Sequence, residues 1–391
     1  MSPPKKRRPA SAKSEAKPKE AKVRVRVDPL KEFAEAMSEQ GIATVSQLAN
    51  DEAVPNVLGR VSTGSLALDV ALRNPLEPHG QAGIPLGRVT ELYGPPFIGK
   101  STLLDHVLGE VQKIGGVAIL ADTEISRDRH YTKRLGVDLH KLQYLEFERD
   151  KLYLENVIQA IYKAIDFWGD KHRDTPVIIG LDALGGTATH EEMEKGLTTG
   201  DKAAQPGLAA RVMHRASRLL PGRLAGRRIG LVILNHEYEK IGGFGGGFGQ
   251  GPRRETYGGS GVRHVGTTRL QLYSGGTYIK RSDGTYLGKE VVAKFVKNRL
   301  GDSQCEVRIP ILNGVGVENV YTLFEDLKDA KIIVTSGAWS AINLDGQVLK
   351  FMGWSGLKEK CSEDATLFDR LVFVWKQVKY AVVPVSVPKV P

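Results

Sequence analysis

The segment from Gly94 to Ser101 has the residue types and the spacing of a loop that binds nucleotide phosphates. Two glycines five positions apart let backbone N–H groups approach the phosphates, and a lysine and a serine follow directly. We expect Lys100 to reach the β- and γ-phosphates and Ser101 to hold Mg²⁺. The predicted contacts of the nucleotide in this segment are Gly94, Pro95, Pro96, Phe97, Ile98, Gly99, Lys100, Ser101 and Thr102.

Carboxylates follow two apolar segments that have the character of buried strands. One segment ends at Asp182. Because strand ends meet at the ligand crevice of an open α/β sheet, we expect Asp182 to face the Mg²⁺ ion; a solvated loop aspartate is the alternative. The other segment is followed by Asp122 and Glu124. One of these would be the base that activates water, but alternation along a strand predicts that both point the same way, so spacing does not choose between them.

Residues 242–261 have an unusual composition, because ten of the twenty positions are glycine and the others include aromatic and basic residues. No packed element tolerates so much glycine, so we predict a long mobile loop. Close backbone approach, stacking rings and arginines favour a DNA-binding loop over a surface loop with incidental aromatics. The candidate contacts are Gly242, Gly243, Phe244, Phe248, Arg253, Arg254, Tyr257, Gly258 and Gly259.

A second basic group lies earlier in the chain, in a loop at about 185–206 and in the helix that follows it. Three arginines of that helix are spaced i, i+4, i+7 and therefore share one face. The pattern favours contact with nucleic-acid phosphates; a solvated basic face is the alternative. The lysines of the loop and the arginines of the helix are Lys195, Lys202, Arg211, Arg215 and Arg218.

The elements that must position these residues alternate between strand and helix from Arg88 onward. Strands are predicted at Val89–Tyr93, Val117–Leu120, Val177–Leu181 and Gly230–Leu234, and helices at Ser101–Lys113, Leu152–Trp168 and Leu208–Leu220. This alternation predicts an α/β fold, a P-loop core with a mostly parallel, doubly wound sheet. After about Leu270 we expect hairpin-like strands with turns at 274–276 and 282–284, and a small α+β domain from Ile311.

Charge and composition set the broad class. The chain of 391 residues has a formal net charge of +10, and residues 1–28 hold ten Lys or Arg against three Asp or Glu. Their low apolar content predicts a disordered basic tail, with a solubilising, a DNA-binding or an address role. No apolar run has membrane length, and the two cysteines are Cys305 and Cys361. These features exclude a membrane-spanning protein, a disulfide scaffold and a structural zinc module.

Several segments, in the same order along the chain, resemble the RecA family of DNA strand-exchange proteins. The resemblance covers about residues 58–360 and includes the phosphate loop. The other segments that carry it are Val61–Asp69, Asp122–Glu124, Tyr131–Asp138, Gly207–Met213, Val296–Arg299 and Gly337–Trp339.

The resemblance assigns roles that spacing leaves open. It implies that Glu124 activates water and that Asp128 and Tyr131 contact the adenine of ATP. It also implies that Asn235 and His236 sense the γ-phosphate at the root of the second loop, where bacterial members usually have Asn-Gln. A histidine there would still donate a hydrogen bond, with a charge that depends on its site.

Lys297 and Arg299 alternate with apolar residues, which is also typical of an exposed strand face. The resemblance implies instead that this pair reaches the ATP of the next subunit.

A predicted helix at Leu30–Met37 is our candidate for docking on a neighbouring subunit.

The resemblance therefore implies an ATP- and Mg²⁺-dependent DNA recombinase in the cytoplasm of a bacterial or phage-infected cell. Such a protein would form a helical homo-oligomer on single-stranded DNA and exchange strands with double-stranded DNA. Two alternatives are a hexameric ring motor with the same fold and a DNA-binding accessory that holds ATP without hydrolysing it. The expected divisions are a tail at 1–28, a docking helix and linker at 29–60, an ATPase core at 61–310 with DNA loops at about 185–206 and 236–262, and a small domain and tail at 311–391.

Overall fold

A computed structural model describes most of the chain from residue 57 to residue 380. The described ranges are 57–73, 82–196, 207–239, 254–281, 284–301, 303 and 305–380. The predicted tail at 1–28, the predicted helix Leu30–Met37 and the C-terminal segment from Ala381 lie outside them.

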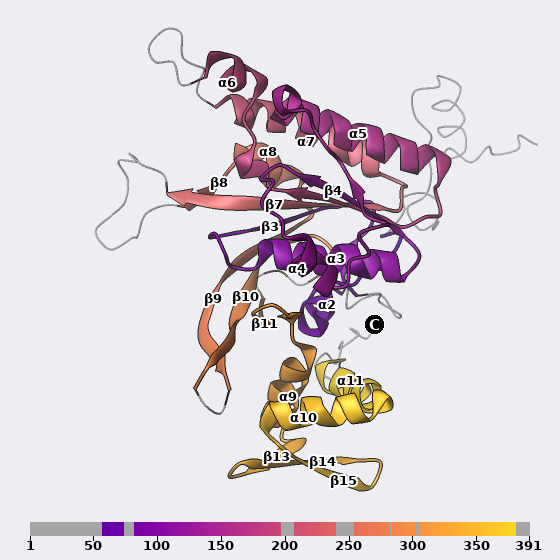
Figure 1. Ribbon diagram of the computed structural model, residues 1–391. Coiled ribbons are helices and arrows are strands. Elements are labelled where there is room, and N and C mark those ends of the chain that lie inside the picture. Colours follow the sequence, from indigo (N-terminus) through magenta and orange to yellow (C-terminus); the bar gives the residue numbers. More distant parts are fainter. Residues whose placement is uncertain are drawn as a thin grey trace, which may run out of the picture. The chain divides into compact units, whose positions relative to one another are not determined.

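A sheet of ten strands forms the centre of the fold, and five of its strand pairs are parallel (Figure 1). Along the sheet the order is β12-β11-β10-β9-β3-β7-β6-β4-β5, and β8 pairs with the end of β7. These strands are β3 (Val89–Gly94), β4 (Val117–Asp122), β5 (Gln143–Tyr144), β6 (Val177–Asp182), β7 (Ile229–Glu239), β8 (Arg254–Thr256), β9 (Thr268–Lys280), β10 (Tyr286–Asn298), β11 (Glu306–Leu312) and β12 (Gly316–Val317). The sequence predicted an α/β core with a mostly parallel sheet, and the structure confirms it.

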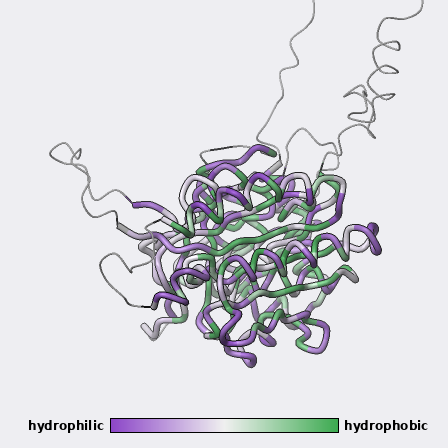
Figure 2. The backbone as a smooth tube through the Cα atoms, turned by 90° about the horizontal axis from the view of Figure 1, so that it is seen from above, coloured by the Kyte–Doolittle hydropathy of each residue, from purple (hydrophilic) through white to green (hydrophobic). Residues whose placement is uncertain are grey.

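Helices cover both faces of this sheet (Figure 1). One face packs on α3 (Lys100–Lys113) and the other on α5 (Leu154–Lys171) and α7 (Leu208–Leu224), which gives two hydrophobic cores separated by the sheet. Hydrophobic stretches accordingly run through the interior and hydrophilic ones lie outside (Figure 2). The remaining helical elements of the core are α2 (Leu66–Leu72), α4 (Arg129–Arg134), α6 (His190–Lys195) and α8 (Gly259–Val265), with short 3₁₀ turns at Arg149–Lys151 and Leu184–Gly186.

The central strands form because their residues can be buried on both faces. All six residues of β6, Val-Ile-Ile-Gly-Leu-Asp, are buried. The glycine of this strand, Gly180, makes room for α3, since a Cβ there would lie 2.9 Å from Cδ1 of Leu104. Close packing of α3 on β6 fixes the distance between the two elements that carry Ser101 and Asp182.

A small C-terminal domain has its own core. It contains α9 (Asn319–Asp329), a three-stranded sheet of β13 (Ile333–Ser336), β14 (Trp339–Leu344) and β15 (Gln347–Met352), and then α10 (Gly353–Glu363) and α11 (Ala365–Tyr380). Trp375 is fully buried there, and its indole N–H donates to Asp326 at 2.7 Å. Leu66 and Val70 of α2 pack against this core, so the small domain rests on the part of the chain that contains the large sheet.

One predicted turn and one predicted loop differ from the structure. The turn expected at 274–276 is a bulge inside β9, because three residues between Ser274 and Tyr278 oppose one residue between Lys289 and Val291. Gly276 there has a φ of +75°, which a glycine adopts without strain. The loop expected at about 236–262 is also shorter, because its ends continue β7 and form β8 and α8.

Within the described ranges, no helix combines the length and apolar content needed to span a bilayer.

His106 joins the phosphate-loop helix α3 to β12. Its Nε2 accepts a hydrogen bond from the backbone N–H of Val317 at 3.0 Å. Two glycines with positive φ allow this approach, since a Cβ would lie 2.9 Å from the Cβ of His106 at Gly64 and 2.4 Å from its Nε2 at Gly316. Burial, with a smaller effect of Lys113, lowers the pKa of His106 to about 4.

This buried neutral histidine predicts a loss of stability in acid. The folded-state pKa lies below the unfolded one, so the stabilisation is complete above pH 6.5 and falls as the pH drops towards 4. Between pH 7 and pH 5 the group should cost the fold roughly 2 kcal/mol. His106→Gln, which keeps a neutral acceptor, should lose less unfolding free energy over this range in urea titrations. Equal losses in both proteins would contradict this assignment.

Candidate nucleotide and nucleic-acid site

The phosphate loop lies between the end of β3 and the start of α3. Gly94 has a φ of 155° and Gly99 a φ of 110°, and a side chain at either position would collide with a neighbouring strand. Nζ of Lys100 is folded back into the loop, where it donates to the carbonyls of Gly94 at 3.0 Å and Pro95 at 2.9 Å. Burial lowers the pKa of Lys100, and Glu124 and Asp182 oppose this effect. The loop thus holds an ammonium group at the amino end of a helix, where phosphates bind well.

Phe97 contributes to this loop only through its backbone. Its side chain is 97% exposed, and its φ of 57° turns the chain at the tip of the loop. The carbonyl of Phe97 accepts from Nζ of Lys289 on β10 at 2.9 Å. The sequence motif predicted the loop but not this tether to the antiparallel part of the sheet.

Asp128 and Tyr131, which we expect at the adenine, lie together beside α3. Asp128 is the N-cap of α4 and accepts from the N–H of His130 at 2.8 Å. The hydroxyl of Tyr131 lies 3.1 Å from Oγ1 of Thr102. One short helix therefore presents both predicted base contacts next to the first turn after the phosphate loop.

The carboxyl ends of β4 and β6 bring Asp122 and Asp182 to the same edge of the sheet. They are paired directly across the two strands, and both are buried. Burial raises the pKa of each, Asp182 adds to the rise at Asp122, and Arg127 opposes the rise at Asp182. Asp182 also accepts a hydrogen bond from the hydroxyl of Ser101. Hard oxygen donors from α3 and β6 that touch each other suit Mg²⁺, so these residues fit the predicted role.

Arg127 is a residue of this site that the sequence did not single out. Its Nη2 donates to Oδ2 of Asp182 at 2.6 Å, and it also pairs with Asp105 of α3. Nothing in the spacing of the chain announces the cluster, because its members are far apart in sequence. The presence of an arginine between Asp122 and Asp128 was the one available signal.

Glu124 differs from Asp122 in direction. Because β4 ends at Asp122, strand alternation does not extend to Glu124, and the expectation that both point the same way is wrong. Asp122 accepts from the backbone N–H groups of Glu124 and Ile125 and from Tyr144 on β5. Glu124 instead reaches β7, where its Oε1 lies 2.6 Å from Nε2 of His236. The carboxylate of Asp122 is engaged by the backbone of the turn, whereas that of Glu124 is not. This difference favours Glu124 as the base.

The Glu124–His236 pair rests on the start of the first predicted DNA loop. A Cβ at Gly185 would lie 3.1 Å from Cδ2 of His236, and a Cβ at Gly186 would lie 3.2 Å from Cγ of Glu124. His236 itself lies near the end of β7, from which the second predicted loop departs. The pair therefore contacts the root of the first predicted loop at Gly185 and Gly186, and its His236 lies at the root of the second.

Asn235 links the second loop to a buried charge. Its Nδ2 donates to Oε1 of Glu91 and to the carbonyl of Tyr257, both at 2.9 Å. Glu91 is fully buried and pairs with Arg269 at 2.5 Å. Through this amide the segment that leaves the sheet at β7 is tied to the segment that returns before α8.

Several predicted DNA contacts have other partners. The ring of Tyr257 packs against the core beside α5 and α7, and burial raises its pKa. Gly258 and Gly259 form the start of α8, where Gly258 has a φ of 81° and packs against Val262. Lys195 pairs with Glu191 at 2.6 Å. These observations correct the view of 254–262 as mobile loop and give these glycines and Tyr257 a packing role.

The remaining candidates are exposed or outside the described ranges. Arg211, Arg215 and Arg218 are exposed on α7, on one face as predicted. Arg254 is also exposed and lies 3.8 Å from Glu237. Outside the described residues are Lys202, Gly242, Gly243, Phe244, Phe248 and Arg253.

Lys297 and Arg299 lie at the opposite edge of the sheet from the phosphate loop of the same chain. Lys297 pairs with Arg269 on β9, level with the start of β3, whereas the phosphate loop follows its end. Nζ of Lys297 donates to the carbonyls of Arg263 and His264 at 2.8 and 3.0 Å. Lys297 is level with Glu91 and Arg299 with Val89, so three and five residues of β3, roughly 10 and 17 Å, separate them from Gly94.

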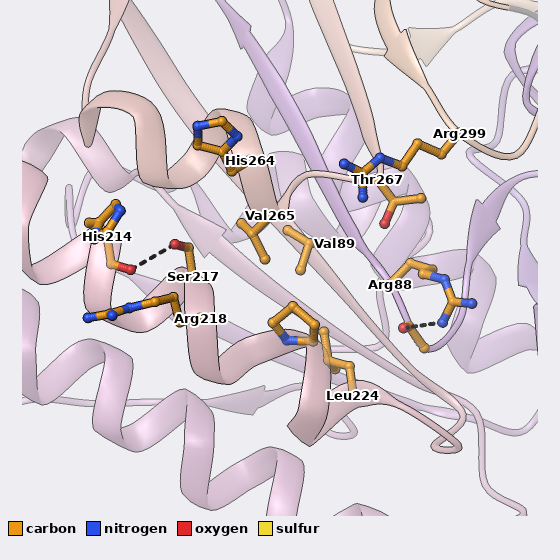
Figure 3. Close-up of a pocket in the computed structure, with 12 residues that line it drawn as sticks. Arg88, Val89, His214, Ser217, Arg218, Leu224, His264, Val265, Thr267 and Arg299 are labelled. Carbon is orange, nitrogen blue, oxygen red and sulfur yellow. Dashed lines mark hydrogen bonds between the residues drawn. The ribbon is translucent and has the colours of Figure 1, made fainter. Parts of the chain in front are cut away.

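Arg299 lines a pocket of about 400 Å³ at this amino edge (Figure 3). Arg88 lies near Arg299 on one side, and His214 and Arg218 come from α7 on the other (Figure 3). Among the described residues that line the pocket there is no Asp or Glu. Arg218 of the basic α7 face and Arg299 of the predicted inter-subunit contact thus line the same positively charged pocket.

Comparisons with known proteins agree with this architecture. The family model described as the RecA N-terminal domain matches residues 31–318. A protein named Protein RecA from Chloroherpeton thalassium is 29% identical over 377 residues, 94% of each chain. Proteins of the same name from Brucella suis and Brucella abortus are each 31% identical over 304 residues, 78% of this chain and 76% of theirs.

The contact between His236 and Glu124 predicts how two substitutions differ. His236→Ala removes the donor that orients Glu124, so ATP turnover should fall about ten-fold or more, with unchanged nucleotide affinity. His236→Gln keeps an N–H donor and should stay within a few-fold of the parent. Steady-state phosphate release and the binding of a fluorescent nucleotide separate the two effects. An alanine variant with full kcat would show that His236 does not position Glu124.

Proposed function

Because the chain is a divergent member of the RecA family, we propose that it is an ATP-dependent DNA recombinase. It assembles as a helical filament on single-stranded DNA and exchanges strands with a homologous duplex. The observation that carries the proposal is the placement of two complementary half-sites at opposite edges of one sheet. One edge holds the phosphate loop with its carboxylates, and the other holds Lys297 and, in a basic pocket, Arg299.

The carboxyl edge binds ATP and prepares its hydrolysis to ADP and phosphate. Backbone N–H groups of the loop and Lys100 bind the phosphates, and Ser101 and Asp182 hold Mg²⁺. When bound, the metal neutralises charge that develops on the phosphate oxygens. Glu124 accepts a proton from the attacking water, and His236 holds Glu124 in place.

The amino edge completes the site of a neighbouring protomer. Nζ of Lys297 binds carbonyls at the amino edge and Arg299 lines the pocket there, so in this proposal the pair serves the triphosphate bound to the next subunit. Two different surfaces that meet in this way make a heterologous, head-to-tail contact, and repetition of such a contact builds an open filament. ATP then acts as part of the interface, and its hydrolysis weakens the contact.

DNA lies along the basic face of α7 and the two loops whose roots flank His236. Arg211, Arg215 and Arg218 neutralise phosphates. Binding of ATP and of DNA is coupled because Glu124, His236 and Asn235 contact both loop roots. The roles expected for residues 1–28, 29–60, 61–310 and 311–391, and a cytoplasmic location in a bacterial cell, remain part of this proposal.

The two alternatives differ from it in assembly and in chemistry. A ring motor would appear as closed hexamers in electron micrographs, whereas a recombinase coats DNA as ATP-dependent filaments. A non-hydrolysing accessory would coat DNA without DNA-stimulated ATP turnover, and Glu124→Gln would then change nothing. Strand exchange between homologous oligonucleotides with and without ATP tests the recombinase directly.

Two variants that damage opposite edges test the shared site. Lys100→Ala disables the phosphate loop, and Lys297→Ala with Arg299→Ala disables the amino edge, so each protein alone should be inactive on DNA. In an equal mixture, roughly a quarter of the random interfaces pair two intact edges, and turnover should recover to about that level.

A matched mixture controls this experiment. Lys100→Ala and Glu124→Gln both damage the carboxyl edge, so mixing them should restore nothing. Absence of recovery in the first mixture, while both proteins co-sediment with DNA, would mean that the site is contained in one protomer.

The basic face of α7 predicts a change in salt dependence. Arg215→Ala with Arg218→Ala removes two phosphate contacts, so the slope of log affinity against log salt should become shallower by about 1.4 for single-stranded DNA. Fluorescence anisotropy at several salt concentrations measures this slope. Lys163→Ala, an exposed lysine of α5, is the control and should keep the parent slope. An unchanged slope in the double variant would place α7 away from the DNA.

A further inference from the structure

Arg127 lies in a buried cluster formed by carboxylates from three different elements. Its side chain is 12% exposed, and those of Asp105, Asp122 and Asp182 are 3%, 3% and 9% exposed. Nη2 of Arg127 lies 2.6 Å from Oδ2 of Asp182, Nη1 pairs with Asp105, and Nε is 4.0 Å from Oδ2 of Asp122. Thr132 of α4 donates to Asp105 at 2.9 Å, so the anchor of the arginine is itself held.

The cluster has a specific relation to the predicted magnesium ligands. Ser101 and Asp105 are four residues apart on α3, so one helix face presents both the metal ligand and the anchor of Arg127. Asp182 at the end of β6 accepts from the hydroxyl of Ser101 and from Arg127. Arg127 thus connects the two elements, α3 and β6, that carry Ser101 and Asp182.

We propose that Arg127 is a positioning residue for the magnesium site, with Asp105 as its anchor. The guanidinium holds Asp182 and fixes this carboxylate relative to Ser101. The inference rests on the proposed ATP- and Mg²⁺-dependent function and concerns the same site. Groups that orient metal ligands in this way commonly change metal affinity 10–100-fold when removed.

The charges of the cluster agree with a role in orientation. Arg127 and Asp105 neutralise each other, so the pair adds no net charge near the metal ligands. A buried ion pair of this kind contributes little net stability, and hydrophobic residues of similar size often replace it without loss. Orientation of Asp182 is the property that such a replacement would remove.

The paired substitution Asp105→Leu with Arg127→Leu tests the proposal. It avoids leaving Asp105 buried without its partner, as Arg127→Leu alone would, while Asp182 keeps its interactions with Ser101 and Lys100. Binding of a fluorescent ADP analogue is measured during Mg²⁺ titration and again in EDTA. The double variant should need about ten-fold more Mg²⁺ for half-maximal binding, with unchanged affinity in EDTA.

A second variant and the parent protein make each outcome decisive. Arg127→Lys keeps the positive charge without the planar fork, and it should require several-fold more Mg²⁺. Thermal unfolding identifies which variants are folded. If either folded variant responds to Mg²⁺ as the parent does, Arg127 does not position the metal site. If the parent itself binds no nucleotide, the proposed function fails first and this inference fails with it.

Discussion

Charge compensation at the carboxyl edge of the parallel strands governs the rest of this structure. Asp122 and Asp182 end two neighbouring buried strands, and burial alone raises the pKa of both. Isolated buried charges are costly unless they are paired and hydrogen-bonded. The chain pairs them through Arg127, and Lys100 lies close enough to interact with Asp182. The same groups form the surface that a triphosphate and its metal would meet.

A short series of contacts links this edge to the roots of the two proposed DNA loops. Glu124 contacts His236, this pair packs against Gly185 and Gly186, and Asn235 ties the end of β7 to the carbonyl of Tyr257. Below this amide lies the buried pair of Glu91 and Arg269. A hydrogen-bond network anchored on a buried ion pair resists partial rearrangement, so its elements are suited to shift together. The position of Glu124, the proposed base, and the positions of both loop roots are therefore linked physically.

Local patterns in the sequence predicted a large part of this arrangement. The phosphate loop, the buried strands and the arginine face of α7 follow from spacing over a few residues, and the structure has them where the periodicity indicates. The cluster around Arg127 could not be predicted, because Asp105, Arg127 and Asp182 meet only when three distant elements pack.

Strand alternation was extended to Glu124 although β4 ends at Asp122, and two further errors came from taking glycine as a sign of loops. At Gly276 the glycine belongs to a bulge within a long strand. At Gly261 it allows α8 to approach α7, since a Cβ would lie 2.7 Å from the backbone of His214. Strand pairing at Gly276 and helix packing at Gly261 decide what the glycine does, and composition encodes neither.

The most direct test of the central claim is hydrogen exchange of backbone amides with a non-hydrolysable ATP analogue and Mg²⁺. If the carboxyl edge controls both loop roots, protection should rise together at the phosphate loop, at 184–187 and at 235–239. Protection confined to the phosphate loop, with both roots exchanging as before, would contradict the account.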